Sequence, residues 1–112
     1  MIPANATVQE VRITTDVAAA SGGAADLLLG TYTISSSTGA LVAVDDDGLC
    51  AAADNALADF SVAGETLVLG KAAGAALIGK TTVGASPVVI APIYVTAAFT
   101  AGALSVTVKY TQ

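Results

Sequence analysis

The chain has 112 residues, of which 25 are Ala and 11 are Gly, and its formal net charge is −5. Apolar residues make up 54 % and charged residues only 12 %, which excludes a disordered chain, because disordered chains are poor in apolar residues and rich in charge. The single cysteine excludes an internal disulfide scaffold. The lack of histidine excludes catalysis by histidine and metal ligation by histidine. We therefore expect one compact domain over residues 1–112.

The four basic residues are scattered singly along the chain, at Arg12, Lys71, Lys80 and Lys109. Nucleic-acid binding needs clustered Lys and Arg that displace counterions from phosphates, so we expect no nucleic-acid partner. The first twelve residues have neither a basic region nor an apolar run typical of a secretory signal. We expect synthesis in a cytoplasm, where the lone thiol of Cys50 stays reduced.

Apolar residues alternate with polar ones along seven segments, which predicts strands with one buried face. In chain order these segments are 7–14, 27–35, 41–44, 65–69, 77–83, 88–99 and 104–111. Segment 88–99 is long enough for two strands or one bent strand, with Pro92 at an edge or a bulge. The residues between the segments have turn compositions, at 21–23, 35–39, 45–48, 64, 84–87 and 101–102. This rhythm predicts an all-β, antiparallel β-sandwich or jelly-roll-like domain.

Two segments could form short helical turns, 49–60 and 71–77. Residues 1–7 lack a core pattern and could form an extended arm that lies on a neighbouring molecule. The window 87–106 is apolar enough to score as a membrane-spanning helix. Its two prolines, Gly102 and many β-branched residues favour buried strands instead, so we expect no membrane partner.

Residues 74–81 read Gly-Ala-Ala-Leu-Ile-Gly-Lys-Thr and match the phosphate-loop pattern G-x-x-x-x-G-K-[ST]. A phosphate loop needs a strand before it and a helix after it, whose N-terminal amides hold the phosphates. The next residues run to Ser86-Pro87 and cannot form that helix. We therefore expect a strand that enters a surface turn, with Lys80 solvated, and no nucleotide cofactor.

An acidic run, Asp45-Asp46-Asp47, precedes Gly48 and gives the best metal candidates in the sequence. With Asp45 and Asp47 at positions three and five of a calcium loop, Gly48 falls at position six and Asp54 at position twelve. Position one is then an alanine, which lacks the first carboxylate of such a loop. We expect an exposed acidic turn, with weak cation binding by Asp45, Asp47 and Asp54 as the alternative.

No other residues form a catalytic constellation, so we expect no enzymatic activity. Cys50 lies in an apolar Leu-Cys-Ala-Ala context without a histidine that could act as its base, which favours a buried, inert thiol. Tyr32, Tyr94 and Tyr110 lie on predicted strands, where we expect them to pack in the core or in an interface.

The closing stretch 99–110, Phe-Thr-Ala-Gly-Ala-Leu-Ser-Val-Thr-Val-Lys-Tyr, resembles the end of many small virion proteins of tailed bacteriophages. The early Thr-Tyr-Thr-Ile-Ser at 31–35 and the Ser/Thr/Gly/Ala-rich, histidine-free composition are similar in style. The likeness is to head decoration, or cement, proteins. That resemblance implies a small β-sandwich or jelly-roll module, often trimeric, that sits outside an assembled capsid and contacts the major capsid protein.

The composition points the same way, because an apolar excess in a small domain suits oligomerisation and docking. A net charge of −5 disfavours a DNA-filled interior. We expect a non-enzymatic virion structural protein that binds the outer capsid surface at capsomer junctions and stabilises the shell. Alternatives are a tail, head–neck or fibre-base protein and, more distantly, a carbohydrate-binding-like sandwich, for which the chain lacks tryptophan.

Overall fold

The structure is a computed structural model that describes residues 1–71 and 74–112. Within these residues it has six strands and two short 3-10 helices, η1 and η2. The strands are β1 (Thr7–Ser21), β2 (Ala25–Ile34), β3 (Leu41–Cys50), β4 (Thr66–Leu69), β5 (Val89–Thr96) and β6 (Phe99–Thr111). The helices are η1 (Ala52–Asp54) and η2 (Leu57–Phe60).

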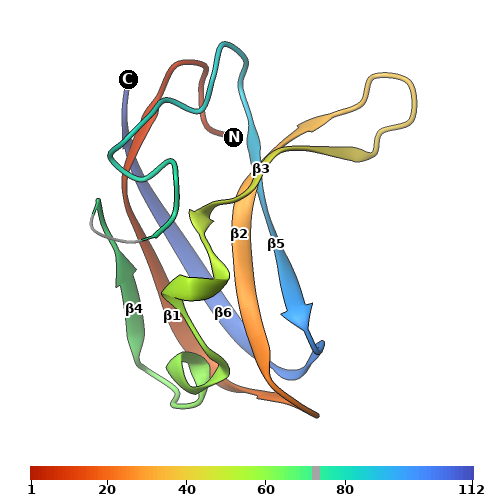
Figure 1. Cartoon of the computed structure of the whole chain (residues 1–112), viewed down its shortest axis with the longest axis vertical. Helices are drawn as coiled ribbons and strands as arrows, with labels where there is room; N and C mark the ends of the chain where they lie inside the picture. The colour runs from red at the N-terminus through yellow and green to blue at the C-terminus, as the bar shows by residue number, and fades with distance from the viewer. Residues whose placement is uncertain (72–73) are drawn as a thin grey trace.

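The strands form two three-stranded antiparallel sheets, with orders β4-β1-β6 and β3-β2-β5. The all-β prediction is therefore confirmed, as a six-stranded sandwich. The chain passes between the sheets at one end through residues 22–24 and 97–98 (Figure 1). The Ser21 hydroxyl donates to the Ala98 carbonyl over 2.9 Å and so ties the two crossings together.

The prediction of a strand at 77–83 is wrong, because the structure has turns and coil there. The amides of Leu77 and Gly79 donate to the carbonyls of Gly48 in β3 and Val8 in β1. These single hydrogen bonds reach two different strands, so the segment does not pair along either of them. Its apolar residues are still buried, since Leu77 and Ile78 enter the core. The apolar pattern of this segment therefore reflects a buried turn and not a strand.

The predicted helical turns are corrected in part. Segment 49–60 begins as the end of β3 and continues as η1 and η2. Each helix has one aspartate, whose carboxylate accepts a hydrogen bond from the backbone amide three residues before it. The Ala51 amide donates to Asp54, and the Ala56 amide donates to Asp59. Of segment 71–77, residues 72–73 lie outside the described residues, and 74–77 are not helical.

Two predicted turns lie inside strands instead. Residues 45–48 belong to β3, where the register with β2 shifts. Residues 101–102 belong to β6, where Gly102 has a φ of 123°. A Cβ on Gly102 would lie 2.8 Å from the Ala19 Cα, so glycine allows β1 and β6 to approach at this irregular point.

The N-terminal residues lie along the chain's own 83–88 segment instead of extending toward a neighbour. Ile2 exchanges two backbone hydrogen bonds with Val88, of 2.8 and 2.9 Å. The Asn5 amide donates to the Gly84 carbonyl, and the Val83 amide donates to the Ala6 carbonyl. Ile2 and Ala6 are buried, which supplies an apolar reason for this segment to fold back.

The core lies between the sheets and receives side chains from both the strands and the long connections. The largest fully buried apolar side chains are Phe60, Ile13, Leu29, Leu49, Ile78, Val8, Val11 and Val88. Phe60 comes from η2 and meets Phe99 edge-on, with ring centroids 6.3 Å apart. In Figure 1 both 3-10 helices lie in front of the gap between β1 and β2. Because Phe60 is fully buried, η2 contributes its ring to the core between the sheets.

Among the described residues, no helix is long and apolar enough to span a membrane. The window 87–106, which scores as such a helix in the sequence, contains β5 and the first part of β6.

Candidate interaction surfaces

The edge of the sandwich formed by β5 and β6, here called the open edge, leaves inward-facing side chains uncovered. Val106 of β6 pairs with Ile13 of β1, so both side chains point to the same face. Ile13 is fully buried, yet Val106 is 41 % exposed. In the other sheet Tyr94 of β5 pairs with Leu27 of β2, and the exposed fractions are 56 % and 6 %. The two sheets thus fail to cover each other along this edge.

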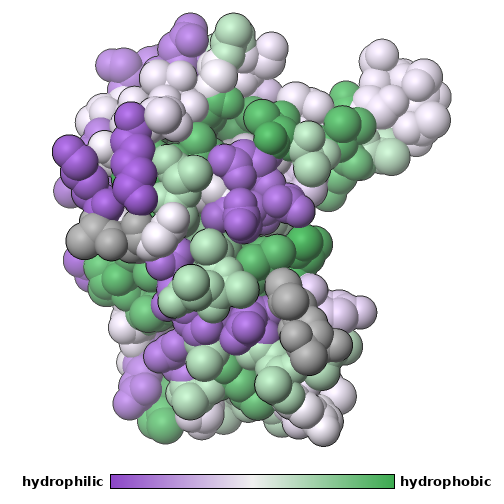
Figure 2. All heavy atoms as spheres, viewed as in Figure 1, coloured by the Kyte–Doolittle hydropathy of each residue, from purple (hydrophilic) through white to green (hydrophobic). Residues whose placement is uncertain are grey.

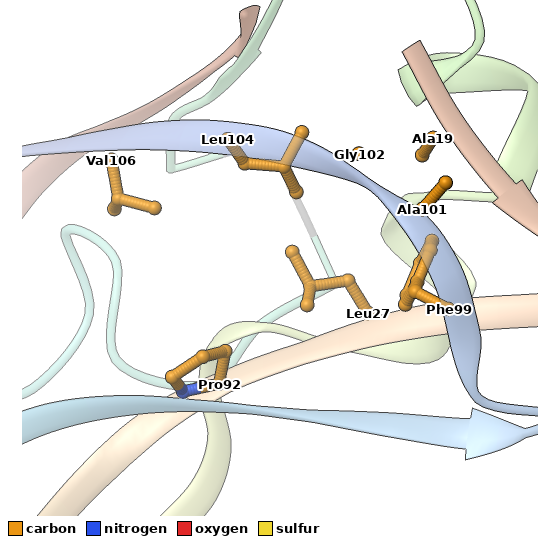
Figure 3. Close-up of a pocket in the computed structure, with 8 residues that line it drawn as sticks. All are labelled: Ala19, Leu27, Pro92, Phe99, Ala101, Gly102, Leu104 and Val106. Carbon is orange, nitrogen blue, oxygen red and sulfur yellow. The ribbon is translucent and has the colours of Figure 1, made fainter. Parts of the chain in front are cut away.

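An apolar cleft, here called the edge cleft, lies between the sheets at the open edge. Its volume is about 210 Å³, and its lining contains no charged residue. Leu104 and Val106 project from β6 toward Leu27 of β2 and Pro92 of β5 (Figure 3). The remaining lining residues are Ala19, Phe99, Ala101 and Gly102. The cleft therefore offers apolar surface and few hydrogen-bonding groups to whatever fills it.

The hairpin between β2 and β3, here called the arm (residues 33–44), projects from the body of the sandwich (Figure 1). Ile34 and Leu41 pair across the arm and share one face, whereas Val42 and Val44 share the other. All four are between 49 % and 55 % exposed. In Figure 2 hydrophobic surface follows the arm up to its pale tip. The arm is thus an apolar ribbon exposed on both faces.

The tip of the arm is held by local hydrogen bonds. The Ser35 amide donates to the Ala40 carbonyl, and the Gly39 amide donates to the Ser35 carbonyl, each over 2.8 Å. The hydroxyls of Ser35 and Ser37 lie 3.1 Å apart. Isolated two-stranded hairpins are marginally stable in water, so these bonds and the continuity with the body favour a formed arm.

At its base the arm is joined to the body by an acidic bulge. Gly30 of β2 faces the chain where β3 carries extra residues, and a Cβ there would lie 2.3 Å from the Asp45 carbonyl oxygen. The bulge brings carboxylate oxygens of Asp45, Asp46 and Asp47 within 4.8 Å of one another. Burial, followed by the hydrogen bond with Asp47, raises the pKa of Asp45. Negative charge therefore gathers at the base of the arm.

The sequence-based cation candidates are only partly brought together. Asp45 and Asp47 lie in this acidic group with Asp46, but Asp54 does not belong to it. The Asp54 carboxylate instead accepts the amides of Ala51, Gly74 and Ala75, at 2.5 to 3.1 Å. Its role in the structure is to tie η1 to the 74–75 segment.

The phosphate-loop resemblance does not correspond to a phosphate cradle. The amides of Gly74 and Ala75 are already bound by Asp54, and those of Leu77 and Gly79 by carbonyls of the protein. The Lys80 ammonium donates to the Ala75 carbonyl over 2.9 Å, so it is not solely solvated as expected. Residues 81–88 are not helical. The donors that a phosphate would need are thus used within the fold.

Cys50 is buried, as predicted. Burial, with a smaller contribution from the Asp54 charge, raises the pKa of its thiol to about 11, so the thiol is neutral and a poor nucleophile at pH 7. Tyr32 is buried and its pKa is raised by burial, while Tyr94 and Tyr110 are 56 % and 43 % exposed. Only Tyr32 therefore packs in the core of the single chain.

The arm and the edge cleft were not found from the sequence. One available signal for the arm was the uncharged stretch 27–44, which surrounds a Ser/Thr/Gly tip. Strand alternation could not identify the cleft, because it marks Tyr94 and Val106 as inward-facing without showing whether the opposite sheet covers them.

No protein family matches the chain, and neither a curated protein nor a solved structure matches it.

Proposed function

We propose that this chain is a non-enzymatic virion structural protein that binds the outer surface of a phage capsid at capsomer junctions and stabilises the assembled shell. Its partners are the major capsid protein and further copies of itself, with a trimer favoured by the resemblance of the closing strand. A location on the outside of the shell suits the net charge of −5, because like charge keeps the chain away from packaged DNA.

The observation that carries the proposal is the amount of apolar surface that one chain leaves uncovered. The arm exposes aliphatic side chains on both faces, and the open edge leaves an uncharged cleft. Soluble monomers seldom expose contiguous apolar surface unless it serves a binding role. Covering the remaining half of the four aliphatic arm side chains would contribute about 4 kcal/mol, at about 1 kcal/mol each.

Stabilisation of the shell follows from mass action. A protein that binds the assembled lattice but not free subunits shifts the equilibrium away from disassembly, as any ligand of a native state does. Repeated binding around the shell adds these contributions, so a modest affinity at each junction is sufficient. No catalytic group or cofactor is needed for this role.

The test is co-sedimentation of the purified chain with empty shells of the major capsid protein encoded nearest to it in its genome. The proposal predicts saturable binding to assembled shells, no binding to unassembled subunits, and a higher melting temperature of the shells. A Val62→Glu variant, altered at an exposed valine outside the arm and the cleft, serves as the matched control and should bind like the unmodified chain. Absence of binding to shells would contradict the capsid role, and binding to tails would favour the tail alternative.

A further inference from the structure

We propose that the arm of one copy docks in the edge cleft of a second copy of the same chain. This contact deepens the self-association part of the proposed function by naming the surfaces involved. It requires no capsid, so it can fail or succeed independently of the capsid role.

The arm cannot reach the cleft of its own chain. Leu27, which lines the cleft, and Ile34, at the start of the arm's turn, lie seven residues apart on the continuous strand β2. At about 3.3 Å per residue they are separated by about 23 Å along a rigid element. An arm that fills an edge cleft must therefore come from another copy.

Charge restricts which surfaces of two copies can meet. Each copy carries a net charge of −5, so most approaches between copies are repulsive. The chain has no charged residue between Asp26 and Asp45, so the arm itself is neutral and its nearest charges are those of the acidic group at its base. The eight residues that line the cleft are also uncharged. The outer part of the arm, with Ile34 and Leu41, and the cleft are thus surfaces that two copies can bring together without placing like charges in contact.

The size and chemistry of the two surfaces also match. An apolar cavity of about 150 Å³ accepts a benzene molecule. The edge cleft, at about 210 Å³, therefore has room for an aliphatic side chain. Ile34 and Leu41 stand side by side on one face of the arm and are the largest apolar side chains it exposes. Of this pair, we place the Leu41 side chain in the cleft, with Ile34 beside it.

The contact joins two different surfaces, so it is heterologous. Each copy then donates one arm and receives one, so the cleft and the Ile34/Leu41 face of the arm are all occupied only when the set of copies closes, while Val42 and Val44 on the other face stay available to the capsid. A closed assembly makes two such contacts per copy, which compensates for the small area of a single arm.

The test is the molar mass of the purified chain in solution, measured by light scattering during size-exclusion chromatography over a range of concentrations. We expect the unmodified chain to form a discrete oligomer. Leu41→Glu should convert it to a monomer, because the carboxylate would have to enter an uncharged apolar cleft. Val106→Glu should do the same from the cleft side.

Val62→Glu is the matched control, because Val62 is 52 % exposed like Leu41 but belongs to neither surface. It should leave the molar mass unchanged. Far-ultraviolet circular dichroism checks folding, and Leu41→Glu keeps the test valid even if Val106→Glu unfolds, because Leu41 contributes nothing to the core. A monomeric unmodified chain, or an oligomer that Leu41→Glu leaves intact, would overturn the proposal.

Discussion

The two edges of this sandwich are built from strands with similar alternation of apolar and polar residues, but only one edge is covered by other parts of the chain. At the β3/β4 edge, the connections over 51–65 and 70–88 place Phe60 and Ile78 in the core, and both are fully buried. At the open edge, β5 and β6 are joined by only two residues, 97–98. That link is too short to cover the edge, so Tyr94 and Val106 remain exposed although they face inward. The length of the connections, more than the strand pattern, decides which edge is closed.

The largest expected effect lies at the closed edge. Phe60→Ala removes a fully buried ring that packs on Phe99 and should lower the free energy of unfolding by about 3–5 kcal/mol. Val106→Ala at the open edge should cost less than about 1.5 kcal/mol, because much of this side chain is already in water. Urea denaturation measures both. Equal losses would show that the two edges are packed alike.

Beyond the end of β3, the side chain of Asn55 takes over hydrogen bonding to the backbone of β2 at the closed edge. Its side chain accepts the Leu27 amide over 2.8 Å and donates to the Leu27 carbonyl over 2.7 Å. Asn55→Ala leaves both buried backbone groups without these partners and should cost about 2–4 kcal/mol of unfolding free energy. Gln9→Ala removes an exposed amide bonded to Thr111 and is the control, expected to change stability by less than about 0.5 kcal/mol. A loss below that of the control would contradict this role.

The buried thiol of Cys50 at the closed edge makes the free energy of unfolding depend on pH in the alkaline range. Its thiol pKa is raised from 9.0 to about 11, chiefly by burial, so the folded state keeps a proton that the unfolded state releases. Stability is therefore fully present below pH 9 and falls as the pH rises toward 11, by up to about 1.4 kcal/mol per pH unit. Cys50→Ala should flatten this part of the stability curve. If stability still falls with the same slope in that variant, other titrating groups cause the loss of stability between pH 9 and pH 11.

The smallest expected effect lies in the arm. Ile34→Ser should change the unfolding free energy of the monomer by less than about 0.5 kcal/mol, because Ile34 is exposed and lies outside the core. Denaturation at low chain concentration isolates this monomer effect from association. A loss above about 1.5 kcal/mol would mean that the arm helps to stabilise its own body.

Much of the fold could be predicted from the sequence, since alternation located six of the seven predicted segments in strands. It failed where tertiary contacts override local pattern. Segment 77–83 alternates because Leu77 and Ile78 are buried from a turn, and the acidic 45–48 run is absorbed into a strand because Gly30 admits the bulge. Both outcomes depend on residues distant in the sequence, which local propensity does not contain.

The candidate surfaces were less predictable than the strands. The apolar excess of the composition correctly indicated uncovered surface, but it could not say where that surface lies. The N-terminal segment, expected as an extended arm, is held by the buried Ile2, and the hairpin at 33–44 projects instead. A projecting hairpin and a core hairpin have the same alternation, and they differ only in whether another layer covers them.

Disulfide trapping between copies tests most directly the claim that a second copy completes the open edge. Single variants Leu41→Cys and Val106→Cys are mixed and oxidised, and linked peptides are identified by mass spectrometry. The native Cys50 stays silent because it is buried and its thiol is protonated near neutral pH. If the arm docks in the edge cleft, position 41 of one copy links to position 106 of another, since a disulfide needs Cα atoms within about 7 Å, while Val62→Cys does not link to position 106. Linkage of position 41 to itself as readily as to position 106, or no linkage at all, would contradict it.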